Sequence, residues 1–174
     1  MERVLVSACL LGARVRYHGG DARAQHDALD RWLAEGRVVA LCPEVAGGLS
    51  TPRPPAEIVE RGSRLRVLTN ESRDVTGAFE RGAAIAAHAV QEHGIRIAVL
   101  KDGSPSCGSS RIYDGTFSGR AVAGDGVTAA RLRSLGVRIF NEMELDQAAA
   151  YLAHLEEPPT LRDNREISCS PLSP

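Results

Sequence analysis

Several features that identify common protein classes are absent from this sequence. Its longest apolar runs fall well short of the about 20 residues that a membrane-spanning helix needs. The formal net charge of the 174 residues is only −1, so no positive field attracts long nucleic acid. The amino-terminal apolar run is shorter than the core of a signal peptide. The sequence therefore predicts a cytoplasmic protein whose partner is a small molecule, not a membrane or a long nucleic acid.

Glycine-rich nucleotide motifs and closely spaced cysteines are absent as well. Neither Gly-x-Gly-x-x-Gly after the first predicted strand nor a Walker pattern is present, which argues against a dinucleotide or P-loop site. The four cysteines, Cys9, Cys42, Cys107 and Cys169, include no Cys-x-x-Cys pair of the kind that structural zinc sites use. Because cytosolic thiols stay reduced, we expect metal ligands or nucleophiles among them, not disulfides.

A regular alternation of apolar runs and amphipathic stretches is present. It predicts strands at residues 3–8, 37–41, 95–100 and 137–140, and helices at residues 26–35, 75–93, 126–135 and 143–155. Helices between strands imply a parallel sheet with right-handed crossovers. We therefore expect an α/β fold, a three-layer α/β/α sandwich with a mostly parallel, Rossmann-like sheet.

The predicted domain organisation is simple. Residues 1–155 form a single domain, and residues 156–174, which are rich in proline, serine and charge, form a disordered tail. Residues 42–57 contain four prolines and two glycines, which predicts a loop without regular structure. A second long loop is expected at residues 101–119, and a small hairpin at residues 58–68. Long loops inside compact domains are usually functional.

Three of the cysteines follow predicted strands. Cys9 and Cys42 come directly after the first and second strands, and Cys107 lies a few residues beyond the third. The carboxyl ends of parallel strands face one crevice, so these thiols are expected to meet there. Three thiolates suit zinc or an iron–sulfur centre and leave a fourth position open, as catalytic sites do. The alternative is that each cysteine only packs in the core; Cys169, in the predicted tail, is not expected to be a ligand.

Polar residues in the same loops are candidates for chemistry. Glu44, two residues after a cysteine, is suited to act as general acid or base, or it is an ordinary solvated carboxylate. Ser104 either donates a hydrogen bond to sulfur or substrate, or it caps a turn. Asp114 and His18, each beside glycine, are expected to form turns.

Other loop residues are candidates for substrate binding. Ser50 and Arg53 offer a hydroxyl and a guanidinium suited to an anion such as phosphate. Lys101, at the end of the third strand, suits the same role, although a lone lysine is more often solvated. Arg14, Arg16 and Tyr17 follow the first cysteine and are expected to form a wall of the pocket.

The motifs that carry these residues resemble the TudS family of thiouracil desulfidases over about residues 2–145. One departure is His18, which stands where the family pattern leads us to expect aspartate. The matching motifs are Ser7-Ala8-Cys9-Leu10-Leu11-Gly12, Cys42-Pro43-Glu44-Val45, the run from Gly47 to Glu57, Asp74-Val75-Thr76, Ser104-Pro105-Ser106-Cys107-Gly108, and Tyr113-Asp114-Gly115-Thr116-Phe117.

The resemblance implies a cofactor and a reaction. It implies a 4Fe-4S cluster held by Cys9, Cys42 and Cys107, with one iron open to the sulfur of the substrate. It further implies catalytic roles for Glu44 and Ser104. The expected reaction is hydrolysis of thiouracil or 4-thiouridine monophosphate to the uracil product and hydrogen sulfide, without net redox change.

Two other functions are compatible with the same residues. A zinc-dependent hydrolase would use the three cysteines as ligands and water in the fourth position. A cysteine-nucleophile enzyme or a non-enzymatic binder would not need all three thiols. Metal content and single cysteine substitutions distinguish these possibilities.

Overall fold

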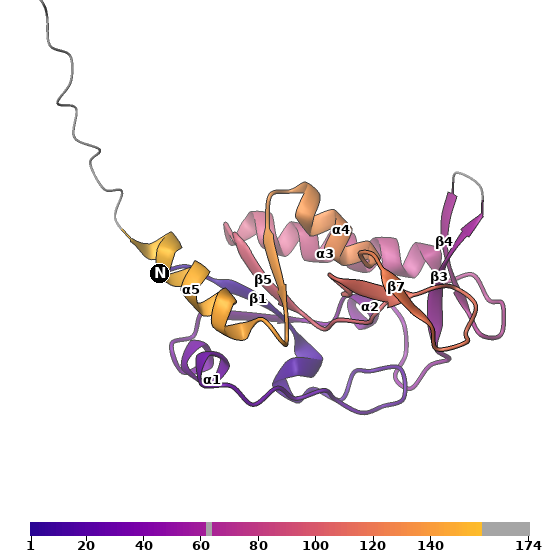
Figure 1. Cartoon of the computed structure of the whole chain (residues 1–174), viewed down its shortest axis with the longest axis horizontal. Helices are drawn as coiled ribbons and strands as arrows, with labels where there is room; N and C mark the ends of the chain where they lie inside the picture. Colours follow the sequence, from indigo (N-terminus) through magenta and orange to yellow (C-terminus); the bar gives the residue numbers. More distant parts are fainter. Residues whose placement is uncertain (62–63, 158–174) are drawn as a thin grey trace, which may run out of the picture.

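Four parallel strands form the central sheet of the protein. The structure is a computed structural model that describes residues 1–61 and 64–157. The strand order is β2–β1–β5–β8, which confirms the predicted parallel α/β sheet (Figure 1). Their bounds are β1 Val4–Ser7, β2 Val38–Leu41, β5 Ile97–Leu100 and β8 Arg138–Asn141.

Helices cover both faces of this sheet and complete the predicted three layers (Figure 1). The helices α1 (Asp27–Ala34) and α5 (Leu145–Glu156) share one apolar core with the sheet. The helices α3 (Thr76–Glu92) and α4 (Val127–Ser134) share a second core on the other face. A short 3₁₀ helix, η1 (Ala8–Leu11), follows β1 directly.

The alternation of side chains along β1 joins these two cores. Val4 and Val6 are fully buried against α1 and α5, whereas Leu5 points into the core beneath α3 and α4. A strand buried on both faces reads as a continuous apolar run, because successive side chains leave it in opposite directions. On the α1 side, Trp32 and Leu29 are each 1% exposed and fill the space beside β1.

Two antiparallel hairpins lie outside the central sheet. The first pairs β3 (Ala56–Arg61) with β4 (Arg64–Thr69), close to the hairpin predicted at residues 58–68. The second pairs β6 (Arg111–Tyr113) with β7 (Ala121–Ala123), inside the segment predicted as an uninterrupted loop. Strands of three residues are too short to show a two-residue hydrophobic period, which explains why this hairpin was not predicted.

The segment after β2 also differs from the prediction. Residues Pro43–Ala46 form a short helix, α2, so the expectation of no regular structure is wrong for these residues. Proline is compatible with the first position of a helix, because its fixed φ suits the helix and its missing N–H needs no partner there. Pro43 therefore begins the helix, and Gly47 ends it.

Direct backbone contact holds α2 against α3. A Cβ atom on Gly47 would lie 2.0 Å from the carbonyl oxygen of Ala78, and one on Gly82 would lie 2.0 Å from that of Pro43. The Arg81 guanidinium also donates to the carbonyl oxygen of Gly47, with N···O distances of 3.0 and 3.2 Å. The position of α2 therefore depends on two glycines that bring the backbones together.

Part of the predicted organisation lies outside the described residues. Residues 158–174, including Cys169, are not described, so the disordered tail and the non-ligand role of Cys169 remain predictions, as does the single-domain boundary at residue 155. Within residues 1–61 and 64–157, no helix has the length and apolarity that crossing a membrane requires.

Replacing Gly82 by alanine is expected to lower the free energy of unfolding by about 1–3 kcal/mol, because the added methyl group forces two backbones apart. Gly77→Ala in the same helix is the matched control, since its Cβ would meet only the flexible Arg81 guanidinium, at 3.5 Å. Alanine's helix propensity should raise the stability of that control by up to about 1 kcal/mol. Urea unfolding followed by circular dichroism measures both, and a Gly82→Ala protein as stable as the wild type contradicts the contact.

Candidate active site

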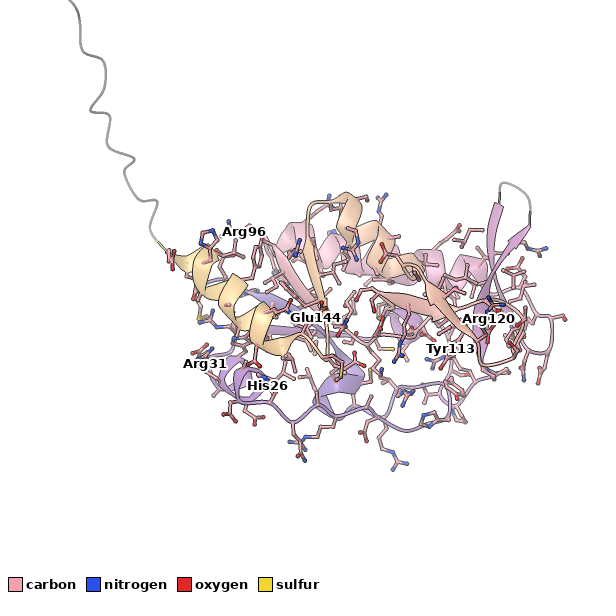
Figure 2. All side chains as sticks on the ribbon, in the orientation of Figure 1. His26, Arg31, Arg96, Tyr113, Arg120 and Glu144 are labelled. Carbon is pink, nitrogen blue, oxygen red and sulfur yellow. The ribbon has the colours of Figure 1, made fainter. Side chains whose placement is uncertain are left out.

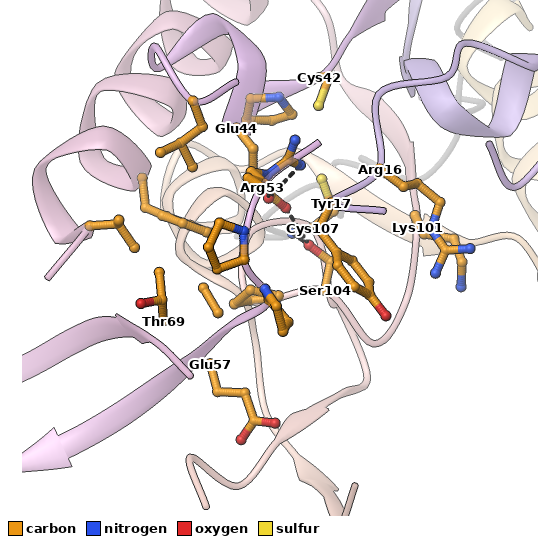
Figure 3. A pocket seen from close by; sticks show the side chains of 18 of the residues that line it. Arg16, Tyr17, Cys42, Glu44, Arg53, Glu57, Thr69, Lys101, Ser104 and Cys107 are labelled. Atoms are coloured by element: carbon orange, nitrogen blue, oxygen red, sulfur yellow. Dashed lines mark hydrogen bonds and ion pairs between the residues drawn. The ribbon is translucent and has the colours of Figure 1, made fainter. Parts of the chain in front are cut away.

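Three thiols line one pocket at the carboxyl ends of β1, β2 and β5. Figure 3 shows two of them, Cys42 and Cys107. The pocket has a volume of about 640 Å³. Cys9 lies in η1, Cys42 immediately precedes α2, and Cys107 lies in the loop after β5. Cys9 and Cys107 are buried, and Cys42 is partly exposed. The sheet topology thus brings together cysteines that are far apart in the sequence.

Burial opposes ionisation of these thiols. It raises the pKa of Cys9 to about 11, and the neighbouring Cys42 raises it too, while Arg16 and Lys101 act in the opposite direction. Burial also raises the pKa of Cys42 and of Cys107, and a hydrogen bond from Ser7 partly offsets the effect at Cys107. Thiolates in this pocket therefore require a bound cation to be stable.

The donor set fits a cofactor that takes several thiolates at once. No histidine lines the pocket among the described residues, and within them no three His, Cys, Asp or Glu side chains are spaced to hold a single metal ion. Cysteine thiolates are the usual ligands of iron–sulfur clusters. A cluster binds each thiolate through a different iron, so its ligands need not converge on one atom.

A hydrogen-bonded chain of Arg53, Glu44 and Ser104 lies in the same pocket (Figure 3). The Arg53 guanidinium donates to Oε2 of Glu44 from Nε at 3.0 Å and from Nη2 at 2.7 Å. The Ser104 hydroxyl donates to Oε1 of the same carboxylate at 3.2 Å. Ser104 Oγ also accepts from the backbone N–H groups of Ser106 and Cys107, at 3.0 and 3.1 Å. Its lone pairs are therefore engaged, and its proton is directed at Glu44.

The structure gives Arg53 a different role from the anion binding predicted for it. Its side chain is only 7% exposed, and two of its nitrogens hold Glu44. The remaining Nη1 donates to the carbonyl oxygen of Ser50 and to the hydroxyl of Thr51. Nε and Nη2 both donate to the same oxygen, Oε2, in a charge-assisted contact, so Arg53 fixes the carboxylate in this structure. Anion binding by Arg53 stays a prediction.

The other predicted substrate-binding residues divide into two groups. Tyr17, Ser50 and Lys101 line the pocket, and Tyr17 is 43% exposed there. The Ser50 hydroxyl is turned to the carbonyl oxygen of Pro52, and the Lys101 ammonium is paired with Glu142. Arg14 does not line the pocket: it is exposed, and its Nε donates to the carbonyl oxygen of Gly19.

Two further residues lie beside the thiols: Arg16, which was predicted to form a wall of the pocket, and Ser7, which the sequence did not single out. Arg16 lines the pocket, and its guanidinium donates a long hydrogen bond of 3.4 Å to the carbonyl oxygen of Asp21. Ser7 is 2% exposed, accepts from the backbone N–H of Lys101 at 3.0 Å, and lowers the pKa of Cys107 against the larger effect of burial. A serine at the end of an otherwise apolar strand was the available signal for Ser7.

Residues 4–144 match the profile of the family described as 2-thiouracil desulfurase. The chain belongs to this family. It is 40% identical over 149 residues to YbbK, an uncharacterized protein of Bacillus subtilis (strain 168), covering 82% of this chain and 97% of that protein. It is also similar to a solved structure described as a [4Fe-4S]-dependent thiouracil desulfidase, TudS, with 50% identity and a TM-score of 0.84, over 88% of this chain and 99% of the other. These findings confirm the resemblance seen in the motifs.

A buried carboxylate organises the cysteine-bearing loop of this desulfurase-family protein. Oδ1 of Asp102 accepts from the backbone N–H groups of Ser109, Ser110 and Arg111 at 3.1–3.2 Å, and Oδ2 accepts from the Ser110 hydroxyl at 2.7 Å. Burial raises the pKa of Asp102, but these hydrogen bonds outweigh it and leave that pKa below its usual value. Asp102 therefore fixes the loop that presents Cys107.

The two predicted turn formers do form turns in this family member. Oδ1 of Asp114 accepts from the backbone N–H and from the hydroxyl of Thr116, at 3.1 and 2.6 Å. Nδ1 of His18 accepts from the backbone N–H of Gly20 at 3.2 Å, and His18 does not line the pocket.

Asp102→Ala is expected to lower the free energy of unfolding by about 2–3 kcal/mol at neutral pH, because it leaves several backbone N–H groups without an acceptor. A carboxylate with a depressed pKa in the folded state stabilises the fold above its unfolded pKa and loses this effect as the pH falls through the folded value. The difference in the free energy of unfolding between Asp102→Ala and the wild type should therefore become smaller at acid pH. Urea unfolding between about pH 7 and pH 3 measures this.

The matched control is Asp102→Asn, which keeps one oxygen for the three N–H groups. We expect it to lose less stability than Asp102→Ala at neutral pH. An alanine variant whose deficit stays constant down to acid pH contradicts the role given to the ionised carboxylate.

Proposed function

We propose that this protein hydrolyses thiolated uracil compounds, replacing the C=S group by C=O and releasing hydrogen sulfide without net redox change. The observation that carries the proposal is the convergence of three thiols with the Arg53–Glu44–Ser104 chain in one pocket. Membership of the 2-thiouracil desulfurase family and the 50% identity to a thiouracil desulfidase support it.

Cys9, Cys42 and Cys107 are the proposed ligands of a 4Fe-4S cluster. When bound, the cluster supplies an iron that carries no protein thiolate and acts as a soft Lewis acid for the sulfur of the substrate. Arg16 and Lys101 are close enough to lower the pKa of Cys9, against the larger effect of burial, so they also favour a negatively charged centre at this position.

Glu44 is the proposed proton carrier. Arg53 holds Oε2, which keeps the carboxylate in place, while Oε1 faces Ser104. Oε1 takes one proton from the attacking water and returns it to the departing sulfur. It then takes the second proton from the new hydroxyl group as C=O forms and passes it to the same sulfur, so both water protons leave in hydrogen sulfide and the carboxylate is regenerated. Ser104, whose hydroxyl proton is directed at Oε1, keeps that oxygen oriented toward the thiols.

The proposed substrates are thiouracil and 4-thiouridine monophosphate. The pocket volume of about 640 Å³ falls in the range of about 300–1,000 Å³ that encloses drug-sized ligands, so a nucleotide and a free base are both of suitable size. Tyr17 and Lys101 line this pocket and are proposed substrate contacts, with Arg16 in place of the more distant Arg14.

Alanine substitution of Cys9, Cys42 or Cys107, one at a time, should abolish the cluster and the activity, because each thiolate holds a different iron. Anaerobic purification followed by iron and sulfide analysis and by visible absorbance measures the loss. Cys169→Ala is the control and should keep the iron content of the wild type. A colourless wild-type protein with stoichiometric zinc indicates a zinc hydrolase instead, and activity that survives the loss of two cysteines indicates a nucleophile or a binder.

Glu44→Gln should lower kcat by a factor of about 10²–10⁴, because the amide cannot carry the proton. The iron content and the KM should stay close to those of the wild type, since glutamine keeps the shape of the side chain. Steady-state kinetics of hydrogen sulfide release measure both constants. Glu80→Gln, at an exposed position on α3, is the matched control. Unchanged kcat in Glu44→Gln contradicts the proton-carrier role.

A further inference from the structure

The loop between β6 and β7 contains a strained aromatic residue. Phe117 has a φ of 57°, in the left-handed region that bulky side chains seldom adopt. Among the described residues, Ser72, with a φ of 62°, is the other non-glycine residue with a positive φ, and it does not line the pocket. Phe117 does line the pocket, and it is 38% exposed. Its conformation is therefore not accounted for by burial in the core.

The loop is docked onto β3 by two contacts. The backbone N–H of Phe117 donates to Oε2 of Glu57 at 3.0 Å, and Glu57 is a β3 residue that is only 8% exposed. A Cβ atom on Gly115 would lie 2.6 Å from the carbonyl oxygen of Ile58, so the loop backbone packs directly on the strand. The strand β6, which leads into the loop, contacts β3. Figure 2 labels Tyr113 and Arg120 near the two ends of the loop.

Hydrogen bonds inside the loop keep it stiff. Asp114 accepts from the N–H and hydroxyl of Thr116, and that hydroxyl also meets the Ser118 hydroxyl at 2.8 Å. The backbone N–H of Asp114 donates to the carbonyl oxygen of Arg120 at 3.1 Å and closes the loop. The strained conformation of Phe117 is thus imposed by its surroundings, as is common at ligand-binding positions.

The pocket extends well beyond the thiols toward this loop. Figure 3 shows Glu57 and Thr69 away from Cys42 and Cys107, although all four line the same pocket. A substrate whose sulfur lies at the cysteines therefore leaves space at the Glu57 end for the rest of a larger molecule.

We propose that Phe117 is a specificity-determining residue whose ring packs against the sugar of a thiolated uracil nucleoside or nucleotide. Glu57 is the positioning residue that holds the Phe117 backbone in its strained conformation. The assignment rests on the proposed function for the identity of the substrate. We therefore expect the Phe117 ring to increase the affinity for nucleosides relative to free bases and to make no contact with the reacting C=S group.

Phe117→Gly tests the ring and the strain together, because glycine adopts a positive φ freely. Its thermal midpoint should equal or exceed that of the wild type. Its affinity for uridine, measured by calorimetry on the protein as purified, should fall about tenfold, while its affinity for uracil stays unchanged. With thiouridine and thiouracil as substrates, the KM should rise only for the nucleoside, and kcat and iron content should be retained.

Ser72→Gly is the matched control, since it relieves the same backbone conformation outside the pocket. It should raise the thermal midpoint similarly and leave uridine affinity unchanged. Glu57→Ala should lower uridine affinity as Phe117→Gly does, and Glu57→Gln should restore it, because the amide oxygen still accepts from the Phe117 N–H.

Unchanged uridine affinity in Phe117→Gly overturns the proposal, and so does an equal loss for uracil and uridine. A lower thermal midpoint in Phe117→Gly, which would give the ring a structural role, also overturns it. A different result contradicts the proposed function. In that case the cluster-loaded wild type releases no hydrogen sulfide from any thiolated uracil, although the variants change uridine affinity as expected.

Discussion

Parallel pairing of β1 with both β2 and β5 is the constraint on which the site depends. Val6 is in register with Ala40 on one side and with Val99 on the other, so the three strands end at nearly the same level. The segments that follow them enter the same space above the sheet. A shift of register in either pair would move one thiol along the sheet while the others stayed, and the fully buried side chains of β1 oppose such a shift.

The polar groups around the thiols are held by internal partners, not by solvent. Glu44 is paired with Arg53, Lys101 is paired with Glu142, and Asp102 satisfies three backbone N–H groups. Paired and hydrogen-bonded charges tolerate burial, whereas isolated ones do not. This arrangement lets the pocket contain several paired acidic and basic side chains, and it fixes their positions.

The sequence was sufficient for the parts of the protein that repeat a simple pattern. The four central strands, the helices between them and the cysteines at strand ends follow from periodicity and from the rule for parallel sheets. The partners of individual charges do not, because Lys101 and Glu142 are 41 residues apart and only the fold brings them together. The guanidinium of Arg53 suits an anion, and only the three-dimensional structure shows that it forms an ion pair with Glu44. The helix α2 does not follow from the high proline content of its segment, because proline usually breaks helices, whereas Pro43 begins this one.

The close spacing of Cys42 with Glu44 and of Ser104 with Cys107 has a mechanical consequence. Each pair joins a thiol to a polar side chain through at most three residues of chain, so movement of the loops cannot separate them widely. The two pairs meet through one hydrogen bond, 3.2 Å long, between the Ser104 hydroxyl and Glu44. A relative displacement of the two loops would therefore change this hydrogen bond, whereas the short stretches of chain would keep each thiol near its adjacent polar group.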